Sequence, residues 1–130
     1  MTVELLNPSD LPTPTMYSHV AIATGTKLVF IAGQEPEDLQ GNLVGSGDLA
    51  VQARLTFANL GRALAAAGAR PDQVTRLGIY LVGYVREHQP IVQEARYEVF
   101  GDHKPVDVMI GVAALARPEQ LIEVEATAVI

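Results

Sequence analysis

The chain contains no cysteine among its 130 residues. Disulfide bonds, thiolate catalysis and cysteine-ligated zinc are therefore excluded. Basic residues are also scarce, because nine lysines and arginines stand against fifteen aspartates and glutamates and give a net charge of −6. A nucleic-acid-binding protein normally presents a basic face, whereas the cations here are scattered along the chain. This balance argues against a nuclease or an RNA chaperone, and we expect no nucleic-acid partner.

Targeting and metal-binding patterns are missing as well. The first ten residues lack a basic segment followed by an apolar one, and no uninterrupted apolar run reaches the length of a membrane span. We therefore expect a cytoplasmic protein with no membrane partner. His19, His88 and His103 do not have the spacing of metal ligands, so surface or locally bonded histidines are expected and no metal site is predicted.

The residues that are present predict one globular domain over 1–130. Apolar residues make up 48% of the sequence and charged residues 18%, which suffices for a real core. The proline-rich segment 6–14 predicts an extended or turning chain. Two short β-type runs, 18–23 and 27–32, are separated by Thr24-Gly25-Thr26, and this pattern predicts a hairpin.

Hydrophobic periodicity predicts two helices. The first runs over 48–67, with Asp48 as an N-terminal cap and Gly68 as a left-handed stop. A continuous apolar strand over 76–82 follows, and a second helix extends from about residue 86 to 100. With two closing strands, the order is ββ-α-β-α-ββ, which is an α+β fold whose helices cover one face of the sheet.

The closing strands, 106–114 and 121–130, alternate strictly. Successive side chains of a strand point to opposite faces, so Val108 and Ile110 oppose Asp107 and Met109. In the last strand, the side opposite the apolar set carries Glu123, Glu125 and Thr127. The sheet face without helices is thus partly apolar and partly acidic. It is either solvated or covered by another copy of the chain, and we favour the second alternative, which predicts an oligomer with acidic groups near its interface.

Several segments, in order over nearly the whole chain, resemble the RidA (YjgF/UK114) family. The matching pieces are Asn7-Pro8 with Tyr17-Ser18, the strand 28–34 ending in Ala32-Gly33-Gln34, Gln52 with Asn59-Leu60 and 64–68, the segment 97–100, and 105–115 with 122–126. The resemblance implies a chorismate-mutase-like fold, a homotrimer, and a small-molecule pocket in each cleft between subunits.

The resemblance also implies an activity, namely cofactor-free hydrolysis of reactive imines and enamines to a carbonyl product and ammonia. Family enzymes grip the substrate carboxylate with an arginine two residues after the proline of the penultimate strand, through two parallel hydrogen bonds. Asp107 occupies that position here. A carboxylate repels an anionic 2-imino acid, so this charge reversal predicts an altered substrate range.

The resemblance and the strand pattern together define the candidate site. The candidate substrate-binding residues are Tyr17, Ala32 in place of the family serine, Gly33, Asp107, and Met109 where cysteine is common. Glu123 is the candidate catalytic residue, because it matches the glutamate thought to position the attacking water. Its alternative role is structural, as an acid bonded to Arg54 or Arg117.

Asp107 itself has three interpretations. On the same sheet face as Glu123, it would share a proton with that glutamate, a pairing typical of acid–base sites. The second interpretation, which we favour at this point, is drift in a pocket that no longer binds an anion. The third is that the carboxylate complements a cationic ligand.

Three functions therefore compete. The first is imine or enamine deamination with a broadened substrate range, in which Glu123 activates water. The second is a non-catalytic module that binds a metabolite or regulates a partner at the trimer clefts, as Asp107 and Ala32 suggest. The third, ribonuclease activity, fits poorly because no basic cluster follows a phosphate backbone.

Overall fold

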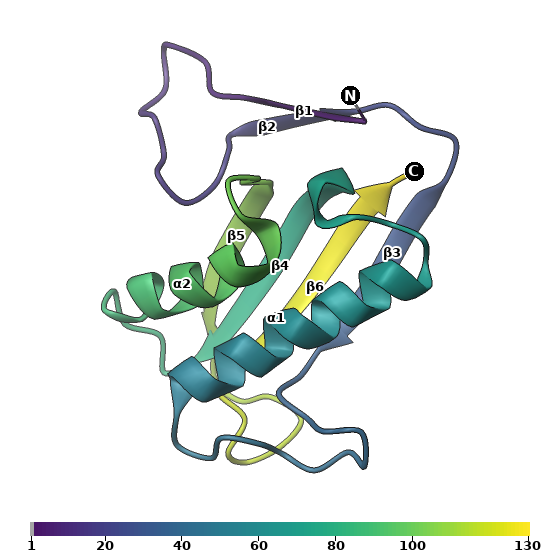
Figure 1. Cartoon of the computed structure of the whole chain (residues 1–130). Helices are drawn as coiled ribbons and strands as arrows, with labels where there is room; N and C mark the ends of the chain where they lie inside the picture. Colours follow the sequence, from purple (N-terminus) through teal and green to yellow (C-terminus); the bar gives the residue numbers. More distant parts are fainter. Residues whose placement is uncertain (1) are drawn as a thin grey trace.

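A computed structural model describes residues 2–130 of the chain. Its elements in chain order are β1 (Val3–Leu6), β2 (Val20–Ala23), β3 (Leu28–Gln34), α1 (Leu49–Ala66), the short 3-10 turn η1 (Pro71–Gln73), β4 (Val74–Val82), α2 (His88–Phe100), β5 (Val106–Val112) and β6 (Ile122–Val129). Figure 1 shows the two helices lying across a twisted sheet, with the β1–β2 pair beyond one end of that sheet.

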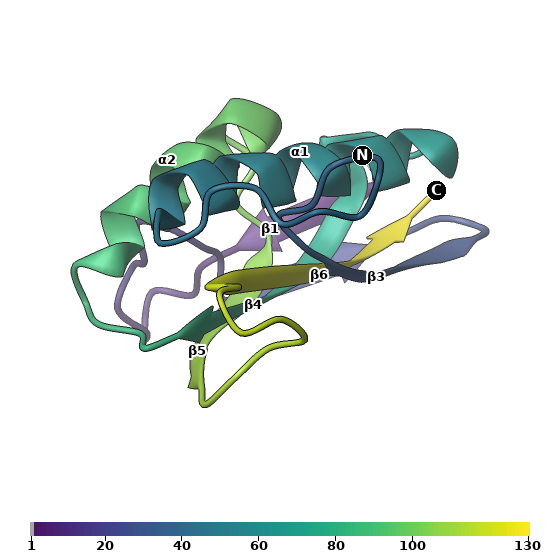
Figure 2. The ribbon, with the colours of Figure 1, turned by 90° about the horizontal axis from the view of Figure 1, so that it is seen from below.

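The main sheet has four strands in the order β3-β6-β4-β5. Strand β6 runs antiparallel to both of its neighbours, whereas β4 and β5 are parallel and are connected through α2. Figure 2 shows both helices in one layer above the sheet. The predicted fold class, an α+β sheet with two helices on one face, is therefore confirmed.

The ends of α1 follow their sequence signals. Asp48 has an extended backbone, and its side chain accepts a hydrogen bond from the Val51 backbone N–H, which otherwise lacks a helical partner. The helix stops before Gly68, whose φ of +74° lies in the left-handed region. Between these ends, α1 buries Phe57, Leu60 and other apolar side chains against the sheet.

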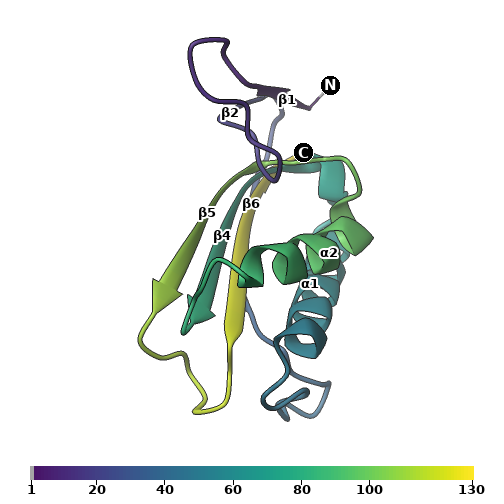
Figure 3. The same ribbon diagram turned by 90° about the vertical axis from the view of Figure 1, so that its left-hand side faces the viewer.

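The predicted hairpin between 18–23 and 27–32 does not form. Strand β2 pairs with β1, a strand that the sequence analysis did not anticipate, and β3 pairs with β6. The intervening segment does not reverse the chain into a ladder, because the backbone N–H groups of Thr26 and Lys27 both donate to the Ile130 carbonyl, at 2.8 and 2.9 Å. This segment therefore connects a separate two-stranded sheet to the main one, as Figure 3 shows.

The two faces of the main sheet differ in their cover. On β6, the side chains that point toward the helices are buried, and they are Ile122, Val124, Ala126 and Ala128. On the opposite, open face, Leu28 is 67% and Phe30 73% exposed. Phe30 stands beside Thr127 in the ladder, so both belong to the open face.

Candidate functional site

A cavity of about 540 Å³ lies between the segment 12–19, the region around the start of α2, and β5. Its walls are formed by Pro12, Thr13, Pro14, Thr15, Met16, Tyr17, His19, Tyr84, Gln89, Asp107, Val108 and Met109. Three of the predicted substrate-binding residues, Tyr17, Asp107 and Met109, are therefore brought together from distant parts of the sequence. Their meeting depends on the N-terminal segment packing beside β5.

Asp107 is held by an arginine from α2. The Asp107 side chain is 8% exposed and the Arg96 side chain 2%, and Nη1 of Arg96 donates to Oδ2 of Asp107. Nη2 of the same guanidinium donates to the Met16 carbonyl, and Nε donates to Gln93 at 3.1 Å. Burial raises the pKa of Asp107 above its ordinary value, and the charge of Arg96 offsets part of that rise. The ion pair thus joins α2, β5 and the N-terminal segment.

The expected proximity of Asp107 to Glu123 is wrong. In the parallel ladder Asp107 stands beside Leu77, which is buried under the helices, whereas Glu123 stands beside Tyr80 in the antiparallel ladder. Successive residues of β4 point to opposite faces, so Leu77 and Tyr80 lie on different sides of the sheet. Asp107 therefore faces the helix layer, where Arg96 compensates its charge, and it shares no proton with Glu123 within one chain.

Glu123 belongs to a second cluster, together with Gly33. A side chain built at Gly33 would collide with the Glu123 carboxylate, so the glycine lets the β3 backbone approach this acid. Oε1 of Glu123 accepts a hydrogen bond from Gln120 at 3.3 Å. Ala32 precedes Gly33 and is exposed, and its carbonyl accepts from the Gln34 side chain. The three predicted residues Ala32, Gly33 and Glu123 are thus neighbours.

The two arginines considered as structural partners of Glu123 are engaged elsewhere in the chain. Arg54 pairs with Glu98 at 3.5 Å on the helix surface. Arg117 pairs with Glu37 in the loop after β3. Within the described chain, Glu123 therefore keeps its carboxylate free of an arginine, which leaves the catalytic assignment as the working hypothesis.

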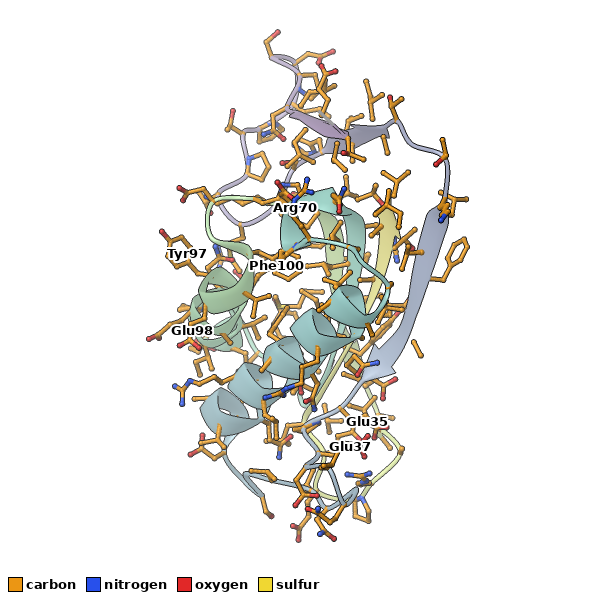
Figure 4. All side chains as sticks on the ribbon, turned by 45° about the vertical axis from the view of Figure 1, so that its right-hand side comes forward. Glu35, Glu37, Arg70, Tyr97, Glu98 and Phe100 are labelled. Atoms are coloured by element: carbon orange, nitrogen blue, oxygen red, sulfur yellow. The ribbon has the colours of Figure 1, made fainter. Side chains whose placement is uncertain are left out.

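Glu35, which directly follows β3, is a residue that the sequence analysis did not single out. Its Oε1 is buried and has no hydrogen-bond partner among residues 2–130. Burial first, and then the negative charges of Glu123 and Glu37, raise the pKa of the Glu35 carboxyl, while Arg117 lowers it. Figure 4 shows Glu35 and Glu37 at the same end of the molecule. A sequence signal existed, because Glu35 immediately follows the Gly33-Gln34 end of an apolar strand.

A further polar group lies on the open face. The Tyr80 hydroxyl donates to Glu125 at 2.9 Å, and Arg76 lies 3.7 Å from the same carboxylate. The hydrogen bond to Glu125 raises the pKa of Tyr80. These contacts neutralise part of the acidic character that the alternation of β6 predicts for this face.

Neither a metal cluster nor a membrane span is found in the described chain. Among residues 2–130, no three histidine, aspartate or glutamate side chains are grouped so that they could hold a metal ion. Across the same residues, no helix combines the length and the apolar character needed to cross a bilayer.

A family model described as Endoribonuclease L-PSP matches residues 9–130. The chain belongs to the RidA (YjgF) family. A solved structure of the Rid-family protein YyfB from Yersinia pestis is 34% identical, covers 100% of both chains and superimposes with a TM-score of 0.93.

Two further relatives are similar to the chain over nearly their whole length. A RutC family protein from Pyrococcus horikoshii is 33% identical over 96% of both chains. The 3-aminoacrylate deaminase RutC of Acinetobacter baylyi is 27% identical over 98% of both chains. The chain is therefore similar, over its whole length, to proteins that include one named as a deaminase.

Proposed function

We propose that this RidA-family protein hydrolyses a reactive imine or enamine to a carbonyl product and ammonia, without a cofactor, at clefts between the subunits of a homotrimer. The observation that carries the proposal is the division of the candidate residues into two groups on opposite faces of one sheet. Tyr17, Asp107 and Met109 line a cavity, while Gly33 and Glu123 lie on the open face. These two groups of residues can face one another only when one copy of the chain packs against another.

Exposed apolar side chains support the assembly. Leu28 and Phe30 on β3 and Ile110 on β5 are exposed on the face that the helices leave uncovered. Burial of apolar area is the main driving force of subunit association, and a cyclic arrangement presents the same face of every copy. A trimer would cover this face and bring the Glu123 cluster of one copy toward the cavity of its neighbour.

In the proposed reaction, Glu123 removes a proton from water while the water oxygen forms a bond to the carbon of the C=N group. The electron pair of that double bond moves to nitrogen, which takes the proton that Glu123 removed and so restores the carboxylate. The product of this addition is a carbinolamine, whose carbon carries both a hydroxyl and an amino group. Its hydroxyl proton passes to the amino group as the C–N bond breaks, so that ammonia leaves and a C=O group remains. Backbone N–H groups beside Gly33 would stabilise charge that develops during the addition.

The test is ammonia release from amino-acid-derived imines with anionic, neutral or cationic side groups, compared with the rate in buffer. We expect Glu123→Gln to lower the rate by about 100-fold or more, the usual range for loss of a general base. Glu98→Gln is the matched control, because Glu98 lies on the exposed surface of α2. If no imine turns over faster than in buffer while the protein is assembled, the deaminase proposal is wrong.

A second candidate is a non-catalytic small-molecule-binding member of the family. Asp107 and Ala32 favour it, because they stand where the resemblance expects an arginine and a serine. A ligand that binds only the folded state raises the melting temperature, so a thermal-shift screen with neutral and charged metabolites probes this function. Stabilisation without turnover of any imine supports it, whereas turnover without stabilisation by any ligand contradicts it.

The ribonuclease activity in the description of the family model is not part of the proposal. Five of the nine basic residues, Arg54, Arg70, Arg76, Arg96 and Arg117, form ion pairs with carboxylates of the same chain. Neutralised cations on separate elements make a poor track for a phosphate backbone.

A further inference from the structure

The wall of the cavity contains no lysine or arginine. Its one carboxylate is that of Asp107, and the remaining lining is phenol, imidazole, amide, hydroxyl or apolar. Arg96 lies behind Asp107 and does not line the cavity, and its guanidinium is already bonded to Asp107, Met16 and Gln93. An anionic ligand would therefore meet no free lysine or arginine of this chain in the cavity.

Of the Asp107–Arg96 pair, the negatively charged residue lines the cavity and the positively charged one does not. Oδ2 of Asp107 accepts from Arg96, whereas Oδ1 has no hydrogen-bond partner among residues 2–130 and is not sealed from solvent. A carboxylate that is held from behind by a guanidinium keeps a fixed orientation. Oδ1 is thus the uncommitted acceptor of a residue that lines the cavity.

Aromatic rings accompany this acceptor. Tyr17 and His19 form an edge-to-face pair with ring centroids 5.6 Å apart. Tyr84 also lines the cavity, and its hydroxyl accepts a hydrogen bond from Gln89 at 2.5 Å, which restrains the ring. The faces of tyrosine rings attract cations, and the attraction grows when the site is shielded from water.

We propose that the cavity binds its small molecule through a positively charged amidinium or ammonium group, with Oδ1 of Asp107 as the acceptor and the rings of Tyr17 and Tyr84 alongside. Arg96 acts as a positioning residue. Its guanidinium fixes the Asp107 carboxylate, and its hydrogen bond to the Met16 carbonyl fixes the segment 12–19 that forms one wall of the cavity. This inference assigns a substrate class to the proposed deaminase and rests on it for the reaction, but the binding step stands on the cavity of a single chain.

The experiment compares three ligands of nearly the same shape: benzamidine, which is cationic, benzamide, which is neutral, and benzoate, which is anionic. Titration calorimetry on the full-length protein should show benzamidine binding at least about tenfold more tightly than benzoate, which corresponds to about 1.4 kcal/mol. Failure to detect benzamidine binding at millimolar concentration, or equal binding of benzoate, would overturn the proposal.

Substitutions test which groups produce the preference. Asp107→Asn retains an acceptor for Arg96 but removes the charge, so benzamidine should lose about tenfold in affinity while benzamide is little changed. Asp102→Asn, which removes an exposed carboxylate just after α2, is the control and should leave both affinities unchanged. An unchanged benzamidine affinity in Asp107→Asn contradicts the proposal.

Three further variants keep the test decisive if Asp107→Asn does not fold. Tyr84→Leu should lower the ratio of benzamidine to benzamide affinity, and Tyr84→Phe should restore it, because phenylalanine keeps the ring face. Arg96→Lys retains the charge but cannot bond Asp107, Met16 and Gln93 together, so it should weaken benzamidine selectively. A ratio that does not change in either Tyr84→Leu or Arg96→Lys counts against the proposal.

The two proposals fail separately. Imine turnover without a preference for benzamidine refutes only the cation site, whereas benzamidine binding without turnover of any imine refutes only the deaminase. The ammonia assay and the calorimetric titration therefore distinguish them.

Discussion

The two faces of the main sheet differ although the same strands build both. On the helix-covered face, β6 contributes Val124 and other side chains that are buried by α1 and α2. On the open face, Phe30 and Leu28 remain exposed beside the Tyr80–Glu125 pair. The chain thus closes one face by itself and leaves the other open. The buried core that stabilises the chain lies on the first face, whereas the Glu123 cluster and the proposed contact between copies lie on the second.

The largest effect is expected at the buried ion pair on the helix side. Arg96→Met leaves the Asp107 carboxylate buried without its partner, so the free energy of unfolding should fall by about 3–5 kcal/mol. Adding Asp107→Leu removes the orphaned charge and should recover most of the loss. Urea denaturation measures both variants, and a loss below about 1 kcal/mol for the single variant would contradict the assigned pairing.

A slightly smaller effect is expected from the apolar core beneath the helices. Ile79 is fully buried, and Ile79→Ala should cost about 2–5 kcal/mol through lost contacts and a residual cavity. Leu39→Ala is the control, because Leu39 is 97% exposed in the loop after β3 and its truncation should cost less than about 0.5 kcal/mol. Similar losses for the two variants would show that the helix-covered face is not the core of the subunit.

The open face should respond in assembly more than in folding. Phe30→Glu places a charge in the exposed apolar patch, and we expect the mass measured by light scattering to fall toward that of a single 13.9 kDa chain. Far-ultraviolet circular dichroism should remain that of the folded protein. A variant that keeps the oligomer intact would mean that this face is not the contact between copies.

The smallest effect is expected at Glu35, and it depends on pH. Because the folded state raises the pKa of Glu35, the folded protein binds a proton more readily than the unfolded chain. Stability is then greatest below the ordinary glutamate pKa and falls as the pH rises through the folded-state value. Glu35→Gln should therefore raise the melting temperature at pH 7 by about 1–3 °C, and the gain should vanish near pH 4. Melting curves at pH 7 and near pH 4 measure the gain in melting temperature of Glu35→Gln. An equal gain at the two pH values would contradict the predicted pH dependence.

Local sequence signals predict the elements well but not all of their partners. Asp48 and Gly68 delimit α1, and the strict alternation of β6 identifies its buried side. From its sequence alone, the segment 28–34 fits a strand that pairs with β2 as well as one that pairs with β6. The choice depends on contacts between residues far apart in the sequence, and the structure pairs it with β6. The predicted hairpin therefore failed where only tertiary packing could choose the partner.

The candidate site shows the same division. Tyr17, Asp107 and Met109, which the resemblance assigns to one site, line the same cavity. Arg96 was missed, although it follows Val92 by four residues and so lies on the buried stripe of α2, where a charge requires a partner. The side to which Asp107 points follows from its parallel register with β4, which no local pattern specifies.

The separate β1–β2 sheet has a consequence for how the protein can change. The segment that joins β1 to β2 forms one wall of the cavity, yet it is tied to the body through Ser18, which bonds Lys104 and Pro105, and through Met16, which bonds Arg96. None of these links belongs to the β3-β6-β4-β5 ladder. Insertions or substitutions in this stretch can therefore remodel what the cavity admits while the folding unit beneath keeps its sequence. Divergence of ligand preference among relatives need not cost them their scaffold.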